Sequence, residues 1–79
     1  MAQPTQAQYK LIVDTLAKLK KTIEKAQSDA KMGTEVVRQL QNVDLDYEKQ
    51  KLQWVSNELI RNSEKWLKDI NDVQKWMRH

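Results

Sequence analysis

The sequence predicts an all-α protein, a helical hairpin extended to a three-helix bundle or an intertwined helical dimer. The 79-residue chain contains one glycine and one proline, whereas strands and hairpins need turn residues about every 8 to 12 positions. Its apolar residues recur at steps of three and four, which is the helical period. The length fits a single small domain over residues 1–79.

The first helix is expected over residues 5–31. Pro4 and Thr5 resemble a helix start, because proline suits the first turn and threonine caps it; residues 1–3 precede it as a loose tail. An apolar stripe then follows, and its taper from large residues to alanines predicts a close approach of another helix near residue 30. The stripe comprises Tyr9, Ile12, Leu16, Leu19, Ile23, Ala26 and Ala30.

The chain is expected to reverse direction at Gly33. Glycine is the usual residue at the C-terminal cap of a helix, and the following Thr34 can cap the next one. The sequence therefore predicts a turn at Gly33 and a second helix over residues 34–61.

Two apolar arcs divide the remaining chain, more than about 90° apart on a helical wheel. One straight helix would present both arcs, and a single partner helix could not cover them. The segment therefore either breaks or has two partners. The early arc comprises Val36, Leu40, Val43, Tyr47 and Trp54, and the late arc comprises Leu45, Leu52, Val55, Leu59, Trp66, Ile70, Val73 and Met77.

Breaks are expected in one of two segments rich in capping residues, 42–46 and 62–64. A return helix starting at residue 34 matches the first helix, about 40 Å long, by residue 61. The remaining apolar segment would overhang. It is expected to form a third helix over residues 63–78, either folded back on the chain or packed against another chain.

The residue types present in the chain argue against an enzyme, a cofactor site or a metal site. The chain has no cysteine, its only histidine is His79, and it has no glycine-rich loop for phosphate. Asp44, Asp46 and Glu48 are interpreted as carboxylates at a helix start, where they favour the helix dipole.

Protein–protein binding through helix faces, self-association included, is the function that the sequence favours. Aromatic residues beside leucine or methionine are typical of interaction hot spots. Trp66 is expected in the core of the late arc, and Ser56 and Ser63 leave room for a neighbouring side chain. The expected partner-binding residues are Val36, Leu40, Val43, Tyr47, Trp54, Trp66, Ile70, Trp76 and Met77.

A lysine strip on the first helix supports an alternative function, weak contact with phosphate or nucleic acid. The chain has a net charge of +3, but the strip contains no arginine and no interleaved aromatic residue, which disfavours nucleic acid as the main partner. Acidic residues in the last segment likewise disfavour a membrane surface. The strip comprises Lys10, Lys18, Lys21 and Lys25.

A cytoplasmic location is expected, because the sequence shows no signal-peptide pattern, no membrane-spanning run and no cysteine. Secretion without a signal peptide stays open as an alternative. In size and outline the chain resembles two groups of helical hairpins from bacterial secretion systems, the secreted Trp-x-Gly proteins and the type III needle subunits. Lys31-Met32-Gly33 stands where the first group has Trp-x-Gly, and the proline-containing turn of the second is absent.

Overall fold

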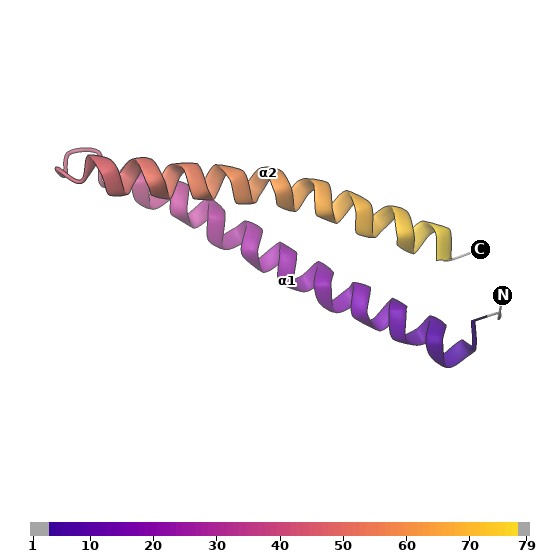
Figure 1. Cartoon of the computed structure of the whole chain (residues 1–79). Helices are drawn as coiled ribbons and strands as arrows, with labels where there is room; N and C mark the ends of the chain where they lie inside the picture. Colours follow the sequence, from indigo (N-terminus) through magenta and orange to yellow (C-terminus); the bar gives the residue numbers. More distant parts are fainter. Residues whose placement is uncertain (1–3, 78–79) are drawn as a thin grey trace.

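The protein is a hairpin of two long helices, seen in a computed structural model that describes residues 4–77 (Figure 1). Helix α1 covers Gln6–Gln39 and helix α2 covers Asp46–Met77. At a rise of about 1.5 Å per residue each helix is about 50 Å long, and the molecule measures 60 × 18 × 15 Å. The helices separate toward their free ends (Figure 1).

Helix α1 begins where the sequence predicts. Thr5 is its N-cap, and Gln8 and Thr5 form a capping box. The Gln8 backbone N–H donates to Thr5 Oγ1 at 3.1 Å, and the Thr5 backbone N–H donates to Gln8 Oε1 at 2.9 Å. This reciprocal pair satisfies backbone donors that a helix start otherwise leaves free.

The predicted turn at Gly33 is wrong, because Gly33 lies inside α1. Its φ is not positive, as a glycine cap would require. A Cβ at this position would lie 2.3 Å from Ser56 Oγ and 3.5 Å from Leu52 Cδ1. Glycine therefore allows α2 to pass close to α1. Thr34 is likewise no N-cap, since its hydroxyl donates to the Lys31 carbonyl of the same helix at 2.7 Å.

The chain reverses at residues 40–45, which overlap the other segment rich in capping residues, 42–46. The Val43 N–H donates to the Leu40 carbonyl at 3.0 Å, which closes the turn. Lys49 Nζ donates to the carbonyl of Gln41 at 3.3 Å and ties α2 to this turn. Two acidic residues, Asp46 and Glu48, lie in the first turn of α2, where their charge favours the helix dipole.

Helix α2 is continuous, so the predicted break at residues 62–64 and the separate third helix are also wrong. Ser63 does not cap a helix, because its hydroxyl donates to the Ile60 carbonyl at 2.7 Å. The overhang that required a third helix disappears once the turn moves to residues 40–45, since the two helices then match in length. The predicted helix end at residue 78, the N-terminal tail at residues 1–3 and His79 lie outside the described residues.

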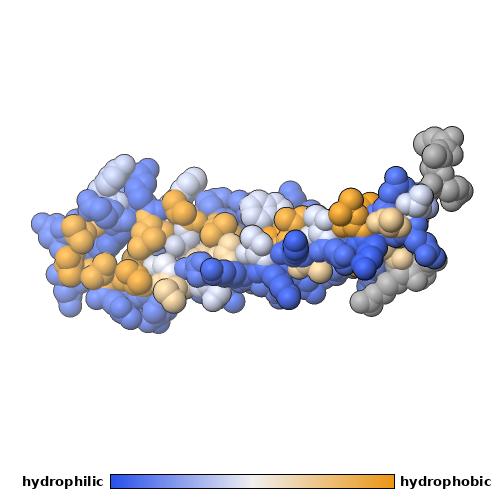
Figure 2. Space-filling model, turned by 90° about the horizontal axis from the view of Figure 1, so that it is seen from below, coloured by the Kyte–Doolittle hydropathy of each residue, from blue (hydrophilic) through white to orange (hydrophobic). Residues whose placement is uncertain are grey.

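Small residues form the closest contact between the helices. The buried residues in the part of the chain described are Ala30, Ser56, Ser63 and Ile70. Many larger apolar side chains remain at the surface, and hydrophobic groups appear along the length of the face in Figure 2, most densely toward the turn. Within residues 4–77 the contact is thus narrow and made mostly of small residues, with Ile70 as its buried large apolar side chain.

Replacing Gly33 by leucine tests the close approach. The added side chain would meet Ser56 and Leu52, so we expect the free energy of unfolding to fall by about 1–3 kcal/mol, as in other overpacked contacts. Met32→Leu is the matched control, because Met32 directly precedes Gly33 and its side chain is exposed. We expect it to change the free energy of unfolding by less than about 0.5 kcal/mol. Urea unfolding followed by circular dichroism measures both. An unchanged midpoint for Gly33→Leu would contradict the contact with α2.

Candidate functional site

The contact between the helices follows a regular pattern of steps of three and four. On α1 it includes Leu16, Ile23 and Ala30 and alternates with polar positions such as Lys20 and Gln27, whereas Leu19 is exposed. The contact is therefore rotated relative to the predicted apolar stripe. One side of that stripe is left uncovered.

The uncovered side carries two rows of apolar or small residues, one from each helix, which together we name the docking face. Within each row the residues are seven positions apart, so they lie on one side of their helix. The α1 row comprises Ile12, Leu19, Ala26, Gly33 and Leu40, and the α2 row comprises Leu45, Leu52, Leu59, Trp66 and Val73.

Both rows lie on the same side of the hairpin. A Cβ on Gly33 would contact Leu52 of the opposite row, and Ile12 and Val73 line the same hollow near the free ends. Between these two points the antiparallel helices pair Ala26 with Leu59 and Leu19 with Trp66, because every step of seven on one helix matches a step of seven on the other. The rows thus form a ladder of apolar pairs along the hairpin.

Six of the large side chains of the docking face are about half exposed, whereas Leu40 and Leu59 are half-buried. Ile12, Leu19, Leu45, Leu52, Trp66 and Val73 expose between 37% and 50% of their surface. One side of each residue rests on the hairpin and the other faces solvent. Such a large, continuous apolar surface is typical of an interaction site.

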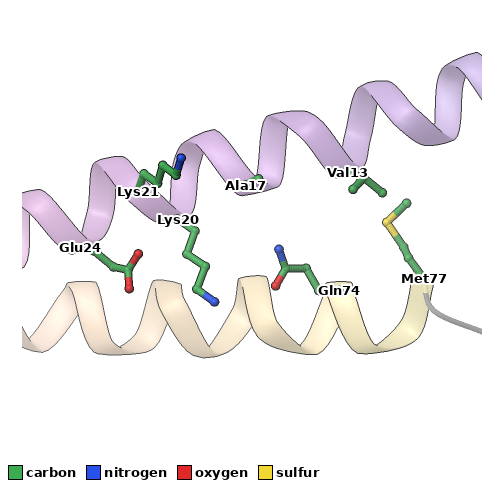
Figure 3. A pocket seen from close by; sticks show the side chains of 7 residues that line it. All are labelled: Val13, Ala17, Lys20, Lys21, Glu24, Gln74 and Met77. Atoms are coloured by element: carbon green, nitrogen blue, oxygen red, sulfur yellow. The ribbon is translucent and has the colours of Figure 1, made fainter.

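The opposite face of the hairpin is mostly polar, with apolar groups at Val13, Ala17 and Met77 near the free ends. Between the separating helices it has a groove of about 520 Å³, into which Lys20, Glu24 and Gln74 project (Figure 3). The exposed rows on this side comprise Lys10, Ala17, Glu24, Lys31 and Arg38 of α1 and Gln50, Asn57, Glu64 and Asn71 of α2. The hairpin as a whole is therefore amphipathic.

The two ends of the docking face differ in shape. At the free ends a hollow of about 250 Å³ is lined by apolar side chains, among them Tyr9, Ile12 and Trp76. At the turn, Leu40, Val43 and Leu45 form an apolar tip. Volumes of this size accommodate side chains of leucine or valine better than an enzyme substrate.

The predicted residues of the late segment are divided by the structure. Ile70 is buried against α1 and is not available to a partner. Trp66 was expected in the core and is instead half exposed on the docking face. Trp76 and the half-buried Met77 line the hollow at the free ends. The expectation for Trp66 is incorrect because Ser63, not Trp66, occupies the position that faces α1.

The early arc is also divided. Val36 and Leu40 are half-buried near the turn, whereas Tyr47 and Trp54 are exposed on the outer edge of α2, on the side of the polar face. There Lys51 Nζ lies 5.6 Å from the centre of the Tyr47 ring, within the range of a cation–π contact. Tyr47 and Trp54 therefore form a separate surface from the docking face.

The predicted lysine strip is exposed along the outer edge of α1 on the side of the polar face. Within residues 4–77 none of its four lysines forms an ion pair; the ion pairs there are Arg38–Glu35, Lys49–Asp46 and Arg61–Glu58. The hydrogen bond with Glu58 raises the pKa of the exposed Arg61 guanidinium.

The sequence does not predict a partner-binding role for four residues of the docking face, Ile12, Leu19, Leu52 and Leu59. All four were recognised as stripe or arc residues and were expected inside the bundle. The only available signal was the row of small residues at Gly33, Ser56 and Ser63, which indicates where the helices approach and hence which large residues stay outside.

Neither a metal site nor a membrane span is found in the described part of the chain. No group of three or more acidic or histidine side chains is placed to hold a metal ion, and neither helix combines the length and apolar character needed to cross a bilayer. Comparisons with protein-family models, with curated proteins and with solved structures find no match to this chain.

Ile70 and Leu11 provide a matched test of which apolar residues hold the hairpin itself. Ile70 is 7% exposed, and Leu11 is 67% exposed and lies outside the docking face. We expect Ile70→Ala to lower the free energy of unfolding by about 2–4 kcal/mol and Leu11→Ala to change it by less than about 0.5 kcal/mol. Urea unfolding at equal protein concentration measures both. Equal losses would contradict the assignment of Ile70 to the contact between the helices.

Proposed function

We propose that the protein is a non-enzymatic helical interaction module and that its docking face binds a helical surface. The observation that supports this proposal is the gathering of half-exposed apolar residues of both helices on one side of the hairpin. A groove between two helices accepts the apolar side of another helix. The side chains of that helix, at helical spacing, fill the gaps between the apolar pairs of the groove.

Burial of the docking face supplies the affinity. Each square ångström of apolar surface removed from water contributes about 25 cal/mol, and Trp66 and the surrounding leucines are half exposed before binding. The polar face carries the charges, including Lys31, Arg38 and Glu64. Those charges keep the far side of the complex hydrated and influence the register and rate of association.

Site-specific photo-cross-linking tests this function. A photoreactive phenylalanine at position 59 lies on the docking face, and the same residue at position 57 lies on the polar face. In cells that produce the protein, we expect a cross-linked adduct from position 59 and little from position 57. Mass spectrometry of the adduct should locate the other end of the cross-link on the apolar side of a helix, whether in another protein or in the same chain.

Two results would contradict the proposal. Equal cross-linking from positions 57 and 59 would mean that the docking face has no preference for a partner. Attachment of the position 59 label to a loop or a strand would mean that the partner surface is not helical. Position 19, which is opposite Trp66 on the docking face, and position 17, which is on the polar face, repeat the comparison on α1.

A second candidate function, contact with phosphate groups, is supported by the exposure of the lysine strip and the lack of ion pairs to it in residues 4–77. Binding to a labelled single-stranded oligonucleotide should then weaken steeply as salt rises from low to moderate concentration. Changing Lys18, Lys21 and Lys25 to glutamine should abolish it, whereas the same change at Lys49, Lys51 and Lys65 of α2 should not. Binding that is insensitive to salt, or equal in both variants, would exclude this function.

A further inference from the structure

We infer that the docking face is covered by a second copy of this chain, packed face to face with its turn at the opposite end. This inference rests on the proposed function and specifies its partner. The resulting dimer is a four-helix bundle in which α1 lies antiparallel to α1 of the copy and α2 lies antiparallel to α2 of the copy.

The exposed area is the first argument. The chain exposes 6934 Å², whereas a compact monomer of 9.4 kDa exposes about 5000 Å². The excess is about 1900 Å² per chain, so two copies together could bury about 3800 Å², within the range of obligate homodimers. The radius of gyration is 18.0 Å, compared with about 12 Å for a compact chain of this length. The elongated shape of the hairpin explains both differences.

The second argument is the order of side-chain sizes along the docking face. When a second copy is turned end over end, its large side chains lie opposite the small ones of the first copy. The central pair is Ala26 with Leu59. On the turn side of it lies the small pair of Gly33 with Leu52, and on the other side lies the bulky pair of Leu19 with Trp66. A copy turned end over end about the central pair brings each bulky pair over a small one.

This arrangement produces layers of nearly equal volume. Each of the two layers beside the centre then contains one glycine, two leucines and one tryptophan, from Gly33, Leu52, Leu19 and Trp66 of the two chains. With both turns at the same end, one layer would contain two tryptophans and another two glycines. The first would be overpacked and the second would leave a void, and both are destabilising.

The ends of the docking face complement each other in the same way. The turn carries an apolar tip formed by Leu40, Val43 and Leu45. The hollow of about 250 Å³ at the free ends is lined by Tyr9, Ile12, Trp76 and other apolar residues. Reversing the copy places the tip of each chain over the hollow of the other, which removes apolar surface of both from water.

Light scattering with a matched pair of variants tests the dimer. We expect the purified protein to have twice the 9.4 kDa mass of one chain. Leu59→Asp places a charge at the centre of the face and should raise the dissociation constant of the dimer about 100-fold or more. Asn57→Asp adds the same charge two residues away on the polar face and should change it less than about 3-fold. Circular dichroism confirms that both variants remain helical.

The orientation is tested separately with a spin label. The sequence contains no cysteine, so Gln41→Cys introduces a single labelling site at the turn. With the turns at opposite ends, the two labels should be about 45 Å apart, since residue 41 is 15 residues of helix from the central pair. With the turns together they would be less than about 25 Å apart, which would overturn the proposed packing.

The results distinguish this inference from the proposed function. A mass of 9.4 kDa up to about 100 µM would overturn the second copy as the partner, and equal effects of Leu59→Asp and Asn57→Asp on a dimer would overturn the docking face as its interface. The interaction function would still stand if position 59 cross-links to a different helical protein. If cross-linking shows no preference for the docking face and the chain is a monomer, both fail.

Discussion

The close contact between Gly33 and Ser56 determines the organisation of the whole hairpin. A glycine and two serines on the facing sides let the helix backbones approach each other without large side chains between them. Close packing of this kind fixes the rotation of each helix about its axis, since rotation toward the docking face would place a leucine or a tryptophan in the gap and rotation toward the polar face would place charged side chains there. The large apolar residues are consequently directed out of the contact.

The antiparallel arrangement then decides where those residues go. In an antiparallel pair the flanking rows of the two helices meet on the same side, so the apolar row of α1 adjoins the apolar row of α2. The other flanking rows, with Glu24, Asn57 and Glu64 among them, also meet and form a polar face. Two moderately amphipathic helices thereby become a strongly amphipathic hairpin, which supports an interaction role for this chain and, in our proposal, assembly into a four-helix bundle.

The wrong predictions of a turn at Gly33 and of a third helix have one physical origin, the two structural uses of glycine. Glycine ends helices because it adopts positive φ, and it also lies inside helices where another backbone must come close. Gly33 is followed by Thr34, which fits the first use, and only the position of Ser56 on the returning helix reveals the second. Placing the turn too early shortened the first helix, and the apparent overhang then required a third helix that the chain does not form.

The sequence by itself determined the helical class, the start of the first helix at Thr5 and the set of large apolar residues. These features depend on local composition and on the helical spacing of apolar residues, both of which are visible in short stretches of sequence. Only the tertiary structure decided that the chain reverses at residues 40–45, that Ile70 is buried and that Trp66 and Leu19 are half exposed on one face. Those features depend on which sides of two helices meet, and that choice is made by contacts between residues more than twenty positions apart, such as Gly33 and Ser56.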